Sequence, residues 1–278
     1  MIMSKVTFLK EIKNIQKVNF SNGKFIEGLI LLKVFTYSCM NCLRSMKYIK
    51  RIYTKYKRYG LQLIILHPYE FEFERDIKGI KGAMKKSGIG FPVIIDKDRK
   101  LIKKLGVNFW PTDILIKSNR IVYSHIGEGD YKKLEKVIRM ELNVNTNLIF
   151  TKEPAYSRIP AVYCGSKKKG IIYPIETRNK RFGVIYADKN WKQDSEYLRA
   201  YNSGRKSLVI ITKGNSINMT AQGLNNNPVS IKVISNSISK KFIIKKPKMY
   251  LLSKRKKSRQ LKILTSSDNL AIYSFTFD

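Results

Sequence analysis

The 278-residue sequence has few of the residues that mark several protein classes. Its three cysteines are too few for a secreted scaffold held together by disulfides. No apolar run reaches the roughly 20 residues needed to cross a membrane, because the candidates are interrupted by Lys33 and Gln62. The first ten residues also lack the long apolar core of a signal peptide. We therefore expect a soluble protein without a transmembrane segment.

Acidic residues are scarce as well, and the formal net charge is +35. Residues 1–150 carry a net +16 and residues 151–278 a net +19, so the excess is spread along the chain. A dedicated nucleic-acid binder concentrates charge on one recognisable element, and we find none, so no specific nucleic-acid partner is predicted. A codon bias toward Lys and Ile is the simplest explanation, although weak attraction to anionic lipid or nucleic acid would follow in either case.

What the sequence does contain is Cys39 and Cys42, at the point where an apolar run meets a helical pattern. Residues 28–35 predict a buried strand, and the apolar spacing over residues 43–59 predicts a helix. Cys39 should lie at the first turn of that helix, where unpaired N–H groups and the helix dipole stabilise a thiolate. A nucleophilic thiol with a second thiol three residues later is what thiol–disulfide exchange requires.

Two other interpretations of the pair are structural. Half of a zinc site would need further ligands, but Cys164, His67 and His125 are scattered and no second CxxC exists, so we predict no metal. Buried structural cysteines are disfavoured because Ser38 and Asn41 indicate a polar, open turn. Cys164 itself is expected to be a buried free thiol.

The remainder of residues 1–142 alternates strands and helices, which predicts a βαβ unit followed by an antiparallel pair. A small hairpin is predicted around an Asn-Gly turn at 20–25. The later elements are a strand at 61–66, a helix at about 75–87, a strand at 91–96, a short helix at 100–105, paired strands at 113–116 and 121–125, and a helix at 131–142.

Beyond a predicted linker at 143–160, helical patterns almost disappear. Short alternating segments separated by turn residues predict an all-β, jelly-roll-like sandwich domain at 161–278. Its expected strands are 170–175, 182–187, 207–212, 215–220, 229–234, 241–245, 248–252, 260–265 and 270–277.

Residues 25–142 resemble a thioredoxin fold, because the CxxC follows the first strand and a Trp-Pro-Thr precedes the antiparallel pair. In that fold a cis-proline faces the CxxC, and Pro111 holds the matching position. The stretch between Cys42 and Pro111 is longer than plain thioredoxin requires and fits the αβ insertion of TlpA-like members. The resemblance implies an α/β thioredoxin domain over residues 1–142.

Three motifs narrow the resemblance to DipZ-like proteins: residues 35–44 (FTYSCMNCLR), the loop at 68–74 (PYEFEFE) and residues 125–131 (HIGEGDY). In that family a membrane CcdA-type domain passes electrons to an extracytoplasmic thioredoxin domain, which is followed by a β-sandwich similar to carbohydrate-binding modules. Trp191 and the segment 271–277 are similar to that module. The membrane domain is missing here, so the electron partner would have to act in trans or be a different one.

The resemblance also implies roles for individual residues. Cys39 would be the attacking thiolate and Cys42 the resolving thiol, with no cofactor beyond their redox-active disulfide. Pro111 would position the substrate, Trp110 would shield the disulfide or contact substrate, and Glu70 would tune the thiols.

The leading hypothesis is therefore a thiol–disulfide oxidoreductase that exchanges electrons with the disulfides of client proteins, in partnership with a separate electron donor or acceptor such as a CcdA-like membrane protein. The alternative is a glycan- or envelope-binding protein in which the CxxC is incidental. Its site would be an aromatic platform of Trp191, Tyr186 and Tyr173, although large aromatic residues more often fill a core. The resemblance implies an extracytoplasmic location, whereas the missing signal implies the cytoplasm.

Overall fold

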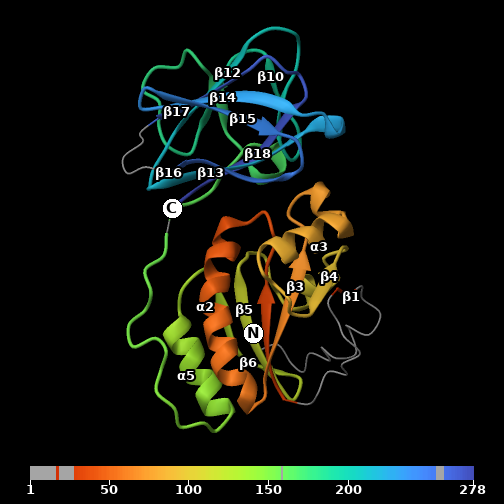
Figure 1. Ribbon diagram of the computed structural model, residues 1–278, viewed down its shortest axis with the longest axis vertical. Coiled ribbons are helices and arrows are strands. Elements are labelled where there is room, and N and C mark those ends of the chain that lie inside the picture. The colour runs from red at the N-terminus through yellow and green to blue at the C-terminus, as the bar shows by residue number, and fades with distance from the viewer. Residues whose placement is uncertain (1–16, 19–27, 158, 255–259) are drawn as a thin grey trace. The chain divides into compact units, whose positions relative to one another are not determined.

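The computed structural model describes residues 17–18, 28–157, 159–254 and 260–278. The hairpin predicted at 20–25 lies outside these residues. The chain divides into two compact units, residues 1–156 and 157–278, each with its own core (Figure 1).

The first unit is built on a six-stranded mixed sheet with the order β1-β4-β3-β2-β5-β6. β2, β3 and β4 are parallel, whereas β1, β5 and β6 join antiparallel to their neighbours. The strands are β1 (Lys17–Val18), β2 (Leu29–Val34), β3 (Leu61–Pro68), β4 (Val93–Asp96), β5 (Thr112–Lys117) and β6 (Arg120–Ile126).

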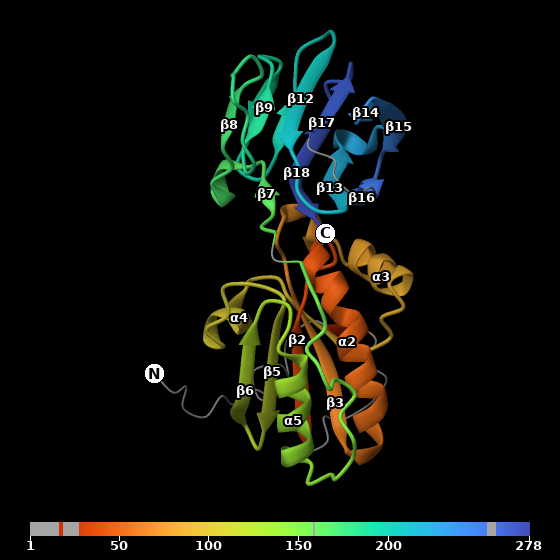
Figure 2. The ribbon, with the colours of Figure 1, turned by 90° about the vertical axis from the view of Figure 1, so that its left-hand side faces the viewer.

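Helices cover both faces of this sheet, which explains why its central strands are almost wholly apolar. Alternate residues of β2 enter two different cores: Leu31 packs with α2, α3 and α5, and Leu32 packs with α4 on the other face (Figure 2). The helices are α2 (Met40–Tyr56), α3 (Ile77–Lys86), α4 (Lys100–Lys104) and α5 (Tyr131–Glu141), with short 3₁₀ turns η1 (Lys57–Tyr59) and η2 (Glu72–Arg75). The predicted order of elements and the thioredoxin fold are confirmed.

Residues 143–156 belong to the first unit, although the sequence placed them in a linker. Phe150 is buried in the core of this unit, and the backbone N–H groups of Ile149 and Phe150 donate to the carboxylate of Glu135. These two apolar residues complete the packing against α2 and α5, which is why the segment does not behave as a free connection.

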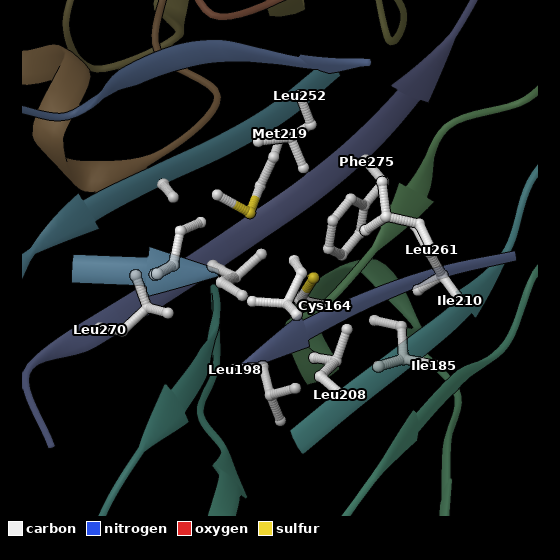
Figure 3. Packing of buried hydrophobic residues seen from close by; sticks show 14 of the residues in the cluster. Cys164, Ile185, Leu198, Leu208, Ile210, Met219, Leu252, Leu261, Leu270 and Phe275 are labelled. Atoms are coloured by element: carbon white, nitrogen blue, oxygen red, sulfur yellow. The ribbon is translucent and has the colours of Figure 1, made fainter. Parts of the chain in front are cut away.

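The second unit consists of two six-stranded sheets that share one apolar core. One sheet has the order β10-β11-β18-β13-β16 with β7 added to β18, and the other has the order β15-β14-β17-β12-β9-β8. Cys164 lies inside this core among aliphatic side chains (Figure 3). All strand pairs are antiparallel except β8 with β9.

The strands of the second unit are β7 (Val162–Tyr163), β8 (Ile172–Pro174), β9 (Ile185–Ala187), β10 (Trp191–Gln193), β11 (Leu198–Ala200), β12 (Lys206–Ile211), β13 (Ser216–Gly223), β14 (Val229–Ser235), β15 (Ile238–Ile244), β16 (Lys248–Lys254), β17 (Gln260–Thr265) and β18 (Leu270–Phe277). Two further 3₁₀ turns are η3 (Ser166–Lys168) and η4 (Leu224–Asn226). The strands β7, β10 and β11 were not predicted, because two or three residues are too few to show an alternating pattern.

Candidate active site

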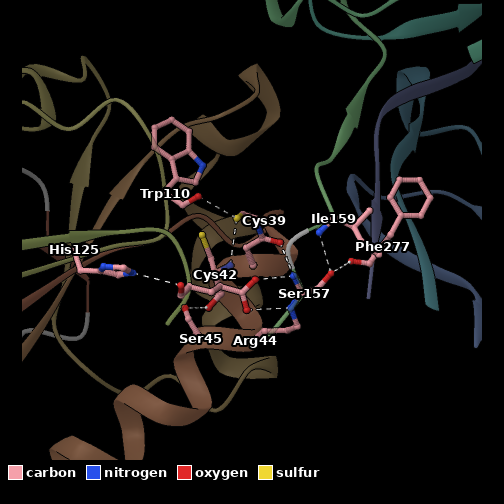
Figure 4. A network of polar contacts seen from close by, with 11 residues as sticks. Cys39, Cys42, Arg44, Ser45, Trp110, His125, Ser157, Ile159 and Phe277 are labelled. Carbon is pink, nitrogen blue, oxygen red and sulfur yellow. Dashed lines mark hydrogen bonds and ion pairs between the residues drawn. The ribbon is translucent and has the colours of Figure 1, made fainter. Parts of the chain in front are cut away.

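Cys39 and Cys42 lie where the chain leaves the carboxyl end of β2 and enters α2. Cys39 is the N-cap residue, one position before the helix, and its sulfur accepts a hydrogen bond from the N–H of Cys42 at 3.3 Å (Figure 4). Both residues are free thiols. Cys39 is partly exposed and Cys42 is fully buried, so an incoming disulfide can reach only Cys39.

Burial has a direct effect on the inner thiol. It raises the pKa of Cys42 well above its ordinary value, and the hydrogen bond and charge of Cys39 act in the same direction. Cys42 is therefore held as a neutral thiol near neutral pH, which suits a group that reacts second.

The loop before β5 lies against one side of the partly exposed Cys39 thiol. The Trp110–Pro111 peptide bond is cis, as the resemblance implied, and the carbonyl oxygen of Trp110 lies 3.9 Å from the sulfur of Cys39. Figure 4 shows that this carbonyl, rather than the indole ring, faces the sulfur. The carbonyl of Pro111 accepts a hydrogen bond of 2.7 Å from Gly127, which fixes the loop against the end of β6.

The indole of Trp110 is held by two charged residues. Its Nε1 donates to the carboxylate of Glu70 at 3.2 Å, and the guanidinium carbon of Arg99 lies 5.4 Å from the ring centre. Glu70 is therefore connected to Cys39 through Trp110, whereas the sequence suggested a direct effect on the thiols. Arg99 carried no sequence signal, because it belongs to an irregular turn before α4.

Glu74 is a buried carboxyl group beside the active-site turn. It accepts hydrogen bonds from the backbone N–H of Ser38 at 3.2 Å and of Glu70 at 2.6 Å. Burial raises the pKa of Glu74 to about 8, and the nearby charge of Glu70 adds to the effect. Glu74 thereby ties the residue before Cys39 to the loop that follows β3, largely in its protonated form at neutral pH.

His67, at the end of β3, is also buried and supports the same turn. Its Nε2 accepts a 3.4 Å hydrogen bond from the N–H of Tyr37, and the two rings stack with centres 5.7 Å apart. Burial lowers the pKa of His67 to about 4, so the imidazole is neutral and able to accept this bond.

A buried ion pair lies beneath the thiols. Lys33 of β2 and Asp113 of β5 are directly paired across the sheet, and the Lys33 Nζ lies 2.9 Å from Asp113 Oδ1 with both side chains almost fully buried. The charge of Lys33 favours the thiolate of Cys42, against the larger opposite effect of burial. The sequence showed Lys33 only as an interruption in an apolar run.

A second ion pair joins the CxxC to the loop after β6. Arg44 binds both carboxylate oxygens of Glu128, at 3.1 Å and 2.6 Å, and its Nη2 donates to the side-chain oxygen of Asn41 at 2.7 Å. The two-point contact with Glu128 fixes the direction of the Arg44 side chain. Arg44 in turn holds the side chain of Asn41, which lies between the two cysteines, in one orientation.

The predicted aromatic platform of the second unit is not formed. Trp191 is buried in the core and donates its Nε1 to the carbonyl of Ser207 at 3.1 Å. Tyr186 is buried as well and lies in the other sheet, while Tyr173 beside it is 40% exposed. Large aromatic side chains stabilise a fold most when they are buried, and Trp191 and Tyr186 are used in this way. They are therefore not available at the surface as parts of a platform.

The other candidate residues, Cys164 and His125, form no hydrogen bond or ion pair with either thiol in the part of the chain that the structure describes. Cys164 is fully buried, and burial raises its pKa well above the ordinary value. His125 lies beside Asp130, with its Nδ1 3.6 Å from the carboxylate. Within the described residues, His, Cys, Asp and Glu form no group of three or more that could hold a metal ion.

Comparison with known proteins finds relatives of the first unit. Residues 9–138 match the family model described as Redoxin. Protein DipZ of Mycobacterium bovis is 30% identical over 116 residues, which cover 41% of this chain and 17% of DipZ. Thiol-disulfide oxidoreductase ResA of Bacillus thuringiensis is 34% identical over 102 residues, which cover 36% of this chain and 56% of ResA.

Among solved structures, a thiol:disulfide interchange protein of the thioredoxin family from Chlorobium tepidum is 18% identical, with a TM-score of 0.36, and the match covers 41% of this chain and 80% of that one. The chain thus spans less than two thirds of the length of the curated relatives DipZ and ResA.

The first unit thus combines a thioredoxin-like fold with a CxxC at the start of α2, and it matches the Redoxin family model over residues 9–138. More narrowly, the first unit is similar in sequence to DipZ and ResA, each over part of its length.

Proposed function

We propose that the protein exchanges electrons with protein disulfides through Cys39 and Cys42. The sulfur of Cys39 attacks one sulfur of the client disulfide, forms a mixed disulfide and releases the other client sulfur as a thiol. Cys42 then gives up its proton and attacks Cys39, which releases the second client thiol and leaves a Cys39–Cys42 disulfide. Two electrons pass to the client, and the reverse sequence oxidises a client dithiol.

The observation that carries the proposal is the contrast between the two thiols. Cys39 is reachable, whereas Cys42 is buried directly behind it, with its N–H 3.3 Å from the Cys39 sulfur. A client can therefore enter a mixed disulfide only with Cys39, and the second thiol is already next to the bond that it must break. The pair itself carries the electrons, so no other cofactor is needed.

A protein client fits the surface around Cys39. Phe109, next to Trp110, is 68% exposed, and Ile126, paired with Thr112 at the start of β5, is 55% exposed. Exposed apolar side chains beside a reactive group favour extended polypeptide as the substrate. Neither residue was singled out in the sequence: Phe109 belongs to no motif, and Ile126 appeared only as one position of the 125–131 motif.

The pair must be returned to its starting state by a separate electron donor or acceptor. We propose a CcdA-like membrane protein for this role. Among the helices of the described residues, none is long and apolar enough to cross a membrane.

The test is to equilibrate the protein in glutathione buffers and to use Cys42→Ser as a trap for mixed disulfides. A midpoint potential near about −270 mV would mark a reductase and one near about −120 mV an oxidant. We expect Cys42→Ser to accumulate adducts through Cys39 and the Cys39→Ser, Cys42→Ser double variant to accumulate none. A pair that does not equilibrate, or adducts that persist in the double variant, would overturn the proposal.

A further inference from the structure

The second unit contains a long stretch of sequence that is rich in basic residues and has no acidic ones. Residues 197–267 contain 16 Lys and Arg and no Asp or Glu. The six acidic residues of this unit all lie outside that stretch, between 176 and 196 or at 268 and 278. Most of this charge therefore has no acidic neighbour along the chain.

Much of it gathers on one edge of the unit. β15 and β16 are the outermost strands of the two sheets, and a three-residue connection, 245–247, joins them. We call these two strands and their connection the β15–β16 edge; Figure 2 shows both strands on the same side of the unit. Its exposed lysines are Lys240, Lys241, Lys245, Lys246, Lys248 and Lys254. Within the described part of the chain, none of the six forms an ion pair.

Aliphatic side chains are exposed on the same edge. Ile243 of β15 is 62% exposed, Leu251 of β16 is 52% exposed and Ile238 is 38% exposed. A small cavity of about 80 Å³ opens between the two sheets here, with Val233 and Leu252 on its apolar side and Lys240 and Lys254 among its polar lining. The edge thus carries both cationic and aliphatic groups at its surface.

Protection against strand pairing does not explain this composition. Natural proteins place a lysine on an edge strand to discourage association with another sheet. Exposed Ile and Leu on the same strands have the opposite effect, because they add apolar area to the edge. A surface that keeps both is suited to a partner with both anionic and apolar parts.

The connection is also held in place. The hydroxyl of Tyr250 accepts a 3.1 Å hydrogen bond from the N–H of Lys245 and donates at 2.8 Å to the carbonyl of Lys246. Its lysines therefore project from a fixed backbone, which lowers the ordering cost of binding.

We propose that the β15–β16 edge binds the surface of a bilayer containing anionic phospholipid. Its cations are all lysines, which act as point charges on phosphate, and its exposed apolar groups are aliphatic and suited to the boundary of the acyl chains. Nucleic acid is disfavoured because the edge offers no arginine fork, and its rings, Phe242 and Tyr250, pack toward the core. This binding is independent of the thiols.

The experiment is co-sedimentation of the full chain with vesicles of phosphatidylcholine, with and without phosphatidylglycerol. We expect binding only to the anionic vesicles, with a strong dependence on salt. Because each lysine near an anionic surface contributes about fivefold, replacing Lys241, Lys245 and Lys246 by Gln should weaken binding by roughly 100-fold.

The matched control replaces the exposed Lys78, Lys81 and Lys85 of α3 by Gln, which removes the same charge from the first unit. It should weaken binding only a few-fold. An equal loss in both triple variants would show an effect of net charge alone and overturn the proposal.

Two further results decide between partners. Replacing Ile243 and Leu251 by Ser should weaken vesicle binding while the salt dependence remains. If these substitutions have no effect, or if the protein binds a DNA duplex but not the anionic vesicles, the assignment to a bilayer is wrong. Unchanged thiol–disulfide exchange and unchanged melting would show that each variant is folded.

Discussion

The two units of the chain each bury a cysteine completely, and the two cysteines differ in what surrounds them. Burial raises the pKa of both Cys42 and Cys164 well above the ordinary value. Cys42, however, is next to Cys39 and within the field of Lys33, whereas Cys164 lies among aliphatic side chains. Burial alone makes a thiol inert, and the accessible partner is what makes the buried thiol of the first unit part of the proposed redox site.

The units also differ in where they keep their charged groups. The first unit buries Lys33, Asp113, Glu74 and His67 around the active-site turn. Among its described residues, the second unit buries one lysine, Lys206, and has most of its other cations at the surface. Because a buried charge is expensive unless paired, both units accept a stability cost: the first at Lys33 and Asp113 beside its thiols, and the second at Lys206, whose Nζ donates to the carbonyls of Gly204 and Ser266.

The largest expected effect is that of the cysteine substitutions on the exchange rate. Cys39→Ser or Cys42→Ser should reduce the catalysed reduction of a protein disulfide to the uncatalysed rate, because each removes one of the two sulfurs that carry the electrons. Cys164→Ser should retain the exchange rate and lose about 1–3 kcal/mol of unfolding free energy, since a hydroxyl replaces a thiol in an apolar core. A loss of exchange in Cys164→Ser would remove the distinction between the units.

The second prediction concerns the stability effect of breaking the buried ion pair. Asp113→Asn leaves Lys33 buried without its counter-charge and should lower the unfolding free energy in urea by about 3–5 kcal/mol. The control is Glu141→Gln, which breaks the partly exposed Lys117–Glu141 pair and should cost less than about 1 kcal/mol. Equal effects of the two substitutions would contradict a special role for burial.

The third prediction concerns pH and Glu74. Its folded-state pKa of about 8 lies above the ordinary 4.5, so protonation favours the folded state. This contribution is complete below pH 4.5 and is lost as the pH rises through 8, at a rate of up to about 1.4 kcal/mol per pH unit. The unfolding free energy of the wild type relative to Glu74→Gln should therefore fall over this range. Parallel profiles in urea titrations would show that Glu74 does not titrate there.

Much of the first unit can be predicted from local patterns. Apolar runs bounded by turn residues predicted β2, β3 and β4, and helical spacing predicted α2 and α5 to within a few residues. The position of Cys39 at the start of a helix also came from this spacing, and the place of Pro111 opposite it came from the resemblance. These features depend on neighbours in sequence or on a family motif.

The remainder of the site depends on pairs that are distant in sequence. Arg44 meets Glu128 across 84 positions, and Glu74 reaches Ser38 across 36. Lys33 and Asp113 meet because β2 and β5 pair in one particular register. A local pattern shows such residues only as charges, and it cannot show which of them the fold will bury.

The smallest prediction compares the two tryptophans, one in each unit. Trp110 donates its indole N–H to Glu70 and Trp191 donates to the carbonyl of Ser207, so replacement of either by Phe removes one hydrogen bond worth about 1 kcal/mol. Trp110→Phe should also slow exchange with a protein disulfide by less than about tenfold, since the carbonyl at position 110, which faces Cys39, is retained. Trp191→Phe should leave the exchange rate unchanged and alter only the melting temperature. A loss in Trp110→Phe as deep as that of Cys39→Ser would mean that the indole itself contacts the client.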